Sequence, residues 1–156
     1  MLGKVQGELL AADAKVAIIV SRFNDLLTRH MADAAADMWT QLGGTSQNLT
    51  VVHVPGSLEL AVTAKKLAES GKYGAVICLG CVIRGETDHF DHVCRQTAEG
   101  LSQVGTQTGV PCIFGVITAD TLEQAIHRAG AKAGNQGAKA MMVGVEMANL
   151  IRKLDD

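Results

Sequence analysis

The sequence predicts a single domain of the α/β class over residues 1–156, with a four-stranded parallel sheet between two layers of helices. Short apolar runs, typical of strands buried on both faces, alternate with segments whose apolar residues recur at helical spacing. No linker, internal repeat or low-complexity tract divides the chain. Alternating strands and helices form a parallel sheet whose right-handed crossovers place helices on both faces. We therefore expect a three-layer α/β/α fold.

The first half of the chain contains two of these strands, each followed by a helix. The β-branched run Lys15–Ser21 predicts the first strand, and Leu49–Val54 predicts the second, which Pro55-Gly56 ends. The helix between them is indicated by apolar residues at helical spacing and a glycine stop: Leu27, Met31, Ala34, Ala35, Met38, Leu42 and Gly43-Gly44. Ser57 is a candidate N-cap for a second helix, which reaches about residue 70. Val5–Leu10 is a candidate for an extra N-terminal edge strand.

The second half of the chain continues the alternation. The apolar runs Ala75–Val82 and Cys112–Ile117 predict the third and fourth strands. Asp120–Glu123 resembles a capping box, with Asp in the place of Ser or Thr, and predicts the start of a short helix that ends near Ala129. The remaining expected elements are a helix from Asp88 to about Val104, a glycine-rich joint at Gly130–Gly137 and a last helix from about Ala138 to Lys153.

Composition argues against several classes of partner. The charges are nearly balanced, with 14 Lys and Arg against 16 Asp and Glu, and no basic run is present, so neither nucleic acid nor an anionic membrane is expected to bind. The beginning of the sequence does not resemble a secretory signal, so the expected location is the cytoplasm. The four cysteines do not suggest a disulfide framework, and Cys78 and Cys81 fall within an apolar run, which favours buried thiols.

The topology predicts where a ligand binds. In an open parallel sheet, ligands bind beyond the carboxyl ends of the strands. Four segments therefore compete for the site, and all are chemically unusual for loops: Ser21–Asn24, Val54–Glu59, Gly80–His89 and Phe114–Thr118.

The most informative stretch is Gly80–His92, which contains the third of these segments. A strand that passes into a helix through a glycine turn leaves backbone N–H groups free at the helix start, where they favour an anion. His89, in the first turn of that helix, is suited to move protons beside the anion.

Phe23, after the first strand, is a candidate to stack on a heterocycle or to act as a staple onto the following helix. Arg128 matters only if its helix end points at a phosphate.

Other known phosphate and metal motifs fit this segment poorly. Gly80-x-x-x-x-Gly85-Glu86-Thr87 differs from the phosphate loop of nucleotide triphosphatases because Glu86 stands where Lys is required. No G-x-G-x-x-G sequence follows a strand, which argues against a dinucleotide fold. A metal site is disfavoured because His89 and His92 are three residues apart, which is not the H-E-x-x-H spacing. An acidic, solvated first turn explains the neighbouring carboxylates better.

Five motifs in collinear order, spread over about residues 15–153, resemble the 6,7-dimethyl-8-ribityllumazine synthase family. They are Ser21–Asn24, Pro55–Glu59, Val82–Phe90, Gly109–Gly115 and Arg128–Asn135. The resemblance implies a flavodoxin-like fold and the penultimate step of riboflavin synthesis. In that step, 5-amino-6-(D-ribitylamino)uracil condenses with 3,4-dihydroxy-2-butanone 4-phosphate. It implies no cofactor and no metal.

The resemblance also implies a role for each site residue. Phe23 stacks on the pyrimidine, with Asn24, Ser57, Leu58 and Glu59 near its ribityl chain, while Val82 and Ile83 present backbone groups to the ring. Gly85, Glu86 and Thr87 hold the phosphate through N–H groups, Arg84 belongs to the same substrate site, and Arg128 pairs with the phosphate. His89 is the proton donor and acceptor. Sites in this family lie between subunits, so Phe114 and Arg128 come from the adjacent chain of a homopentamer or of an icosahedral shell built from pentamers.

Two alternative functions stay open from the sequence. The related archaeal-type riboflavin synthase would dismutate the lumazine product instead of making it. A non-catalytic flavin or pterin carrier, or a shell protein with a vestigial site, would keep the fold without turnover.

Overall fold

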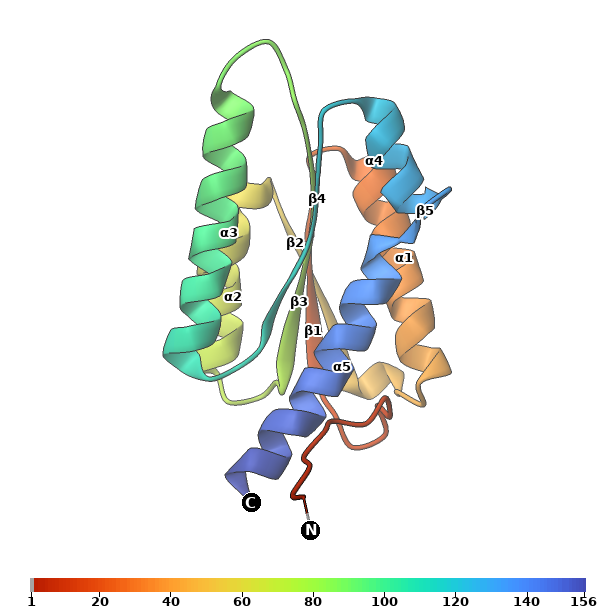
Figure 1. Cartoon of the computed structure of the whole chain (residues 1–156), viewed down its shortest axis with the longest axis vertical. Helices are drawn as coiled ribbons and strands as arrows, with labels where there is room; N and C mark the ends of the chain where they lie inside the picture. The colour runs from red at the N-terminus through yellow and green to blue at the C-terminus, as the bar shows by residue number, and fades with distance from the viewer. Residues whose placement is uncertain (1) are drawn as a thin grey trace.

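A four-stranded parallel sheet forms the middle layer of the computed structural model, which describes residues 2–156 (Figure 1). Its strands are β1 (Val16–Ser21), β2 (Leu49–Val54), β3 (Ala75–Ile83) and β4 (Cys112–Ala119), in the order β2-β1-β3-β4. The central strands β1 and β3 are flanked on both sides and are buried almost throughout, which explains their continuous apolar sequence. The predicted α/β class and the predicted parallel sheet are confirmed.

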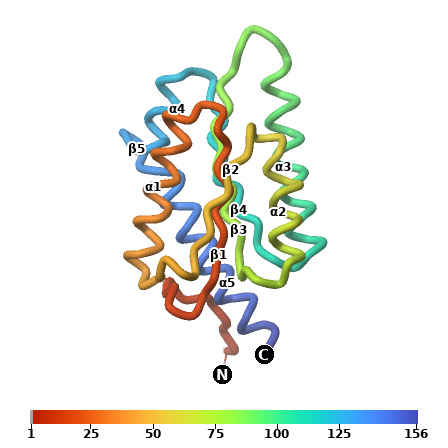
Figure 2. The backbone as a smooth tube through the Cα atoms, turned by 180° about the vertical axis from the view of Figure 1, so that it is seen from behind, coloured from red at the N-terminus to blue at the C-terminus, as the bar shows by residue number. Residues whose placement is uncertain are grey.

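Helices cover both faces of the sheet (Figures 1 and 2). Helices α2 (Leu60–Glu69) and α3 (His89–Thr108) pack on one face, while α1 (Asp25–Gln41) and α5 (Gln136–Asp155) pack on the other. The short helix α4 (Leu122–Arg128) follows β4 on the α1 side. Two short 3₁₀ turns are also present: η1 (Ser46–Asn48) and η2 (Ser57–Glu59). Across residues 2–156, none of the helices has both the length and the apolar character that crossing a bilayer demands.

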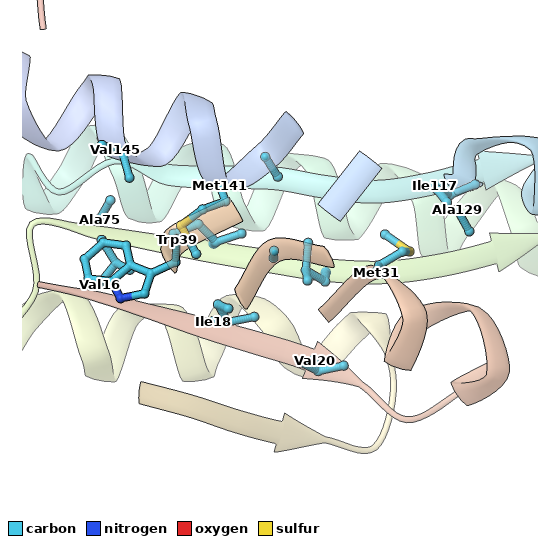
Figure 3. Packing of buried hydrophobic residues seen from close by; sticks show 14 of the residues in the cluster. Val16, Ile18, Val20, Met31, Trp39, Ala75, Ile117, Ala129, Met141 and Val145 are labelled. Carbon is cyan, nitrogen blue, oxygen red and sulfur yellow. The ribbon is translucent and has the colours of Figure 1, made fainter. Parts of the chain in front are cut away.

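The larger hydrophobic core lies between the sheet and α1 with α5 (Figure 3). Alternate residues of β1 contribute Val16, Ile18 and Val20 to this core, which also contains Trp39 of α1 and Met141 of α5. A smaller core fills the opposite face, beneath α2 and α3. Each fully buried aliphatic side chain contributes about 1.5–3 kcal/mol to folding, so the two cores fix the sheet that carries the strand ends.

The expected N-terminal edge strand is wrong. Residues 2–10 form no strand and instead lie against α5. The Asn149 side chain donates to the backbone carbonyls of Glu8 and Leu10, at 2.7 and 2.9 Å, and Lys153 donates to that of Gln6 at 2.8 Å. A Cβ at Gly7 would collide with the α5 backbone at Glu146, so a glycine permits this close approach. These backbone carbonyls therefore receive their hydrogen bonds from side chains of α5 and not from a neighbouring strand.

Two predicted helix caps are also wrong. Ser57 does not cap α2, which begins at Leu60 after the 3₁₀ turn η2. The cap of α4 is Thr121 instead of Asp120: the Thr121 side chain accepts from the Gln124 N–H at 3.2 Å, and Gln124 accepts from the Asp120 N–H at 2.9 Å.

The glycine-rich joint folds into a small antiparallel hairpin of β5 (Ala129–Ala131) and β6 (Gly134–Asn135). It leads into α5, where the Asn135 side chain caps the helix by accepting from the N–H groups of Gly137 and Ala138. This cap starts α5 two residues earlier than the sequence indicates.

Candidate active site

A cavity of about 300 Å³ opens where β1, β2 and β3 end and α3 begins. In Figure 1 this is the upper end of the molecule, opposite the two chain termini. The lining comes from the segments after the three strands and from the first turns of α3: Phe23, Gly56, Ser57, Leu58, Glu59, Cys81, Val82, Ile83, Gly85, Thr87, His89, Phe90 and Val93. The cavity therefore lies where the topology of a parallel sheet predicts a ligand site.

The end of β1 is fixed to its neighbours by main-chain and side-chain hydrogen bonds. The Phe23 N–H donates to the Pro55 carbonyl at 3.1 Å, which extends the pairing with β2 past the strand end. Asn24 adopts a left-handed conformation with φ of 61°, and its side-chain amide donates to the Cys81 carbonyl of β3 at 2.8 Å. Asn tolerates this conformation better than most residues. These bonds hold the Phe23 ring at the cavity mouth, where it is 70% exposed.

The turn after β2 places Ser57 deep in the cavity wall. Ser57 is 7% exposed, and its Oγ lies so near Gly80 that a Cβ added there would be 2.7 Å away. Gly80 thus leaves space for a hydroxyl beside β3. Leu58 and Glu59 follow in the same 3₁₀ turn and line the cavity with their more exposed side chains.

The segment between β3 and α3 carries free backbone donors. Within residues 2–156, the N–H groups of Gly85, Glu86 and Thr87 have no hydrogen-bond partner in the protein. They precede a helix of 20 residues, whose N-terminus carries partial positive charge. Gly85 and Thr87 line the cavity, and Glu86 lies between them on the exposed outer side of the loop. This geometry suits an anion such as a phosphate.

His89 is the first residue of α3 and lines the same cavity. Its imidazole is exposed, and it has no ion pair or side-chain hydrogen bond within the described part of the chain. A ring with both nitrogens available beside an anion site can take up and release protons during a reaction.

Arg84 lies in the same loop but makes its contacts outside the cavity. Its Nε donates to Asp120 Oδ1 at 2.9 Å, its Nη1 donates to Asp91 Oδ2 at 3.4 Å, and its Cζ lies 4.4 Å from the centroid of the Phe90 ring. The hydrogen bonds to Asp120 and Asp91 raise the pKa of Arg84 above its ordinary value.

Phe114 and Arg128 are separate from the cavity of their own chain. Phe114 lies within the edge strand β4 and is 39% exposed, and Arg128 ends α4 on the opposite face of the sheet from α3. The Arg128 Nη1 donates to the Gln124 carbonyl at 3.1 Å. Neither residue is among those that line the cavity.

Four lining residues lie in or directly beside the predicted segments but were assigned no role from the sequence: Gly56, Cys81, Phe90 and Val93. Helical spacing could have indicated Val93, which lies one turn after His89 and Phe90 along α3. Val82, Phe90 and Val93 together form an apolar wall of the cavity.

The Cys81 thiol, which lines the cavity, is a poor nucleophile. Burial raises the pKa of Cys81 to about 11, so this thiol is protonated at neutral pH. No group of three or more His, Cys, Asp or Glu residues within 2–156 is arranged to hold a metal ion. The groups that line the cavity are chemically able to move protons at His89, to bind an anion at the loop and to contact a planar apolar ligand at Phe23.

The comparison with known protein families agrees with this geometry. The model of the family described as 6,7-dimethyl-8-ribityllumazine synthase matches residues 13–152, which include every strand of the sheet and every residue that lines the cavity. A match over most of the chain identifies its family, and with it a place in riboflavin biosynthesis. The chain belongs to the 6,7-dimethyl-8-ribityllumazine synthase family.

Proposed function

We propose that the protein condenses 5-amino-6-(D-ribitylamino)uracil with 3,4-dihydroxy-2-butanone 4-phosphate to 6,7-dimethyl-8-ribityllumazine in this cavity. One observation supports the proposal above all. A single cavity joins an exposed aromatic ring, Phe23, with the free N–H groups of the 85–87 loop and the imidazole of His89. These groups match a planar pyrimidine, a phosphate and the protons that must move between the two substrates.

The reaction demands several proton transfers and no covalent intermediate with the protein. The 5-amino group of the pyrimidine adds to the ketone, and loss of water leaves an imine. The C–O bond to the phosphate breaks with release of inorganic phosphate, and the ribitylamino nitrogen closes the second ring with loss of another water. We assign to His89 the protonation of the departing hydroxyl and the removal of protons from nitrogen and carbon.

Binding and orientation supply the rest of the proposed mechanism. Phe23 stacks on the pyrimidine at the cavity mouth, Val82 and Ile83 present backbone groups to its edge, and Ser57 to Glu59 lie close enough to receive the ribityl hydroxyls. The N–H groups of Gly85, Glu86 and Thr87 bind the phosphate before and after its bond breaks. Two substrates that are bound side by side in the right orientation react as if they were parts of one molecule, which accounts for a large increase in reaction rate without a protein nucleophile.

We further propose that the site is completed by a second copy of the chain in a homopentamer, with or without assembly into an icosahedral shell. Phe114 and Arg128 are not among the residues that line the cavity of their own chain, so in this proposal they serve the cavity of an adjacent chain. Exposed apolar side chains on opposite sides of the sheet support a head-to-tail ring: Val62 on α2, and Leu122 and Ile126 on α4. The mass of the assembly in solution tests the pentamer and the shell directly.

Incubation with the two substrates tests the proposed reaction. The synthase forms lumazine, detected by its absorbance and fluorescence, from the pyrimidine and the butanone phosphate. An archaeal-type riboflavin synthase would instead form riboflavin from lumazine alone, and a carrier would bind lumazine without turnover. Turnover that persists after thorough chelation is expected, since the proposed steps use only protein groups.

A further inference from the structure

We propose that Arg84 is a positioning residue that holds the phosphate loop in place, and that it is not itself a ligand of the phosphate. This inference rests on the proposed function, because it concerns the loop assigned to the phosphate. Arg84 belongs to that loop, and a free arginine beside a phosphate would ordinarily be taken as a direct ligand.

The contacts of Arg84 tie the loop to two other elements. Asp120 follows β4, Asp91 lies in the first turn of α3, and each receives one edge of the guanidinium, at 2.9 and 3.4 Å. The Arg84 backbone N–H donates to the Ala119 carbonyl at 2.9 Å, so main chain and side chain are both held at the end of β4. The loop is therefore fixed at its first residue, directly before Gly85.

The face of the guanidinium is also in use. It lies 4.4 Å from the centroid of the Phe90 ring, and Phe90 is one of the residues that line the cavity. Arg84 therefore supports the apolar wall from outside while it holds the loop above it. With both carboxylates and the ring engaged, its charge is largely offset before any phosphate arrives.

A direct ligand and a positioning residue make opposite predictions for Asp120. If Arg84 binds the phosphate, removal of the Asp120 carboxylate releases the guanidinium and removes a nearby negative charge, so phosphate binds as tightly as before or more tightly. If Arg84 positions the loop, the same change lets the N–H groups of Gly85 to Thr87 move, and phosphate binds more weakly.

The experiment measures binding of inorganic phosphate by calorimetry, together with kcat and KM for both substrates. The variants are Asp120→Ala, Arg84→Lys and the double variant. Asp120 has a side chain that is 64% exposed, so the fold is expected to tolerate its loss, and Asp120→Asn serves as a second, milder variant. Glu123→Ala is the matched control, because it removes a carboxylate from α4 whose only ion pair among residues 2–156 is with His127 at 3.9 Å.

We expect Asp120→Ala and Arg84→Lys each to weaken phosphate binding and to raise KM for the butanone phosphate about tenfold, with KM for the pyrimidine within about twofold. The double variant should be no worse than Arg84→Lys alone, since both changes break one contact. Glu123→Ala should match the wild type. Phosphate affinity that is unchanged or tighter in both Asp120 variants overturns the inference.

The two proposals fail in distinguishable ways. A wild-type protein that binds phosphate but forms no lumazine contradicts the proposed reaction, and the phosphate titrations still decide the role of Arg84. A wild-type protein that forms lumazine, with Asp120 variants that bind phosphate normally, contradicts the role of Arg84 alone.

Discussion

The side-chain amide of Asn24 donates a hydrogen bond to the backbone carbonyl of Cys81 at 2.8 Å and joins the end of β1 to β3. The bond lies beside the candidate site, since Phe23 precedes Asn24, and Phe23, Cys81 and Val82 line the cavity. Asn24 is also the one non-glycine residue within 2–156 with positive φ, at 61°. A single residue therefore supplies both the turn and the link that set the spacing between the stacking ring and the β3 wall.

Replacement of Asn24 should lower stability in a graded way. Asn24→Ala loses the hydrogen bond and strains the left-handed backbone, so we expect a loss of about 1–3 kcal/mol in the free energy of unfolding. Asn24→Gly loses only the bond and should cost about 1 kcal/mol. Urea unfolding at fixed protein concentration measures both, with the exposed Gln47→Ala as control. Equal costs for Ala and Gly would show that the backbone conformation contributes nothing.

His89→Ala should slow the chemical steps without changing the fold. General acid–base catalysis contributes about 10²- to 10⁴-fold, so kcat should fall within that range while both KM values change little. His92→Ala is the control, because His92 is exposed on the same helix three residues further and does not line the cavity. A His89→Ala variant with normal kcat would remove the imidazole from the mechanism.

Phe23→Ala should affect binding of the pyrimidine and little else. The ring is 70% exposed, so its loss removes little buried area from the folded chain. Stacking of a heterocycle on an aromatic side chain is worth about 1–3 kcal/mol, which raises KM for the pyrimidine about 5- to 150-fold. Leu26→Ala, which removes another exposed apolar side chain at 82% exposure, should leave KM unchanged. The opposite ranking of the two variants would argue against a stacking role for Phe23.

If each active site is built from two adjacent chains, mixing two inactive variants should restore some turnover. His89→Ala and Arg128→Ala damage the same site from different chains if Arg128 serves the neighbour. Subunits mixed by dissociation and reassembly should then regain about a quarter of wild-type turnover, because some sites receive both intact residues. A mixture that stays as inactive as its components would place both residues in the site of one chain.

Ionisation of two thiols, the buried Cys81 and the half-buried Cys112, should make the protein less stable at alkaline pH. Burial raises the pKa of Cys81 and of Cys112 to about 11, above the ordinary value of 9.0. A raised thiol pKa favours folding below pH 9, and that contribution is lost as pH rises toward 11, because the unfolded chain releases these protons first. Urea unfolding of the wild type and of a Cys81→Ala/Cys112→Ala variant should show a shallower fall for the variant between pH 9 and 11. The same pH dependence of the unfolding free energy in both proteins would mean that these thiols have the same pKa in the folded and unfolded chain.

The strands were predictable because each is a short run rich in apolar and β-branched residues, which in the central strands β1 and β3 reflects burial on both faces. The structure has β2 at Leu49–Val54, as predicted, and extends β3 by only one residue, to Ile83. Helix caps were less predictable, because several neighbouring residues have side chains that can accept the capping hydrogen bond. Asp120 and Thr121 both carry cap-forming oxygens, and only the folded turn shows that Thr121 accepts the bond from Gln124.

The site was predictable only in part, for a related physical reason. Segment ends such as Ser57 and Gly85 follow from topology, which brings the carboxyl ends of parallel strands together. Arg84 illustrates the part of the site that could not be predicted. Its partner Asp120 lies 36 residues away, and a guanidinium that can reach a phosphate and one that is held by two carboxylates look the same in a sequence.

The most direct measurement mixes the wild-type protein with the pyrimidine and the butanone phosphate and follows lumazine absorbance and inorganic phosphate release together. A condensation in this cavity predicts one phosphate released for each lumazine formed, at the same rate, with both rates about 10²- to 10⁴-fold lower in His89→Ala. Phosphate release without lumazine, or the absence of both signals in the wild type, would contradict it.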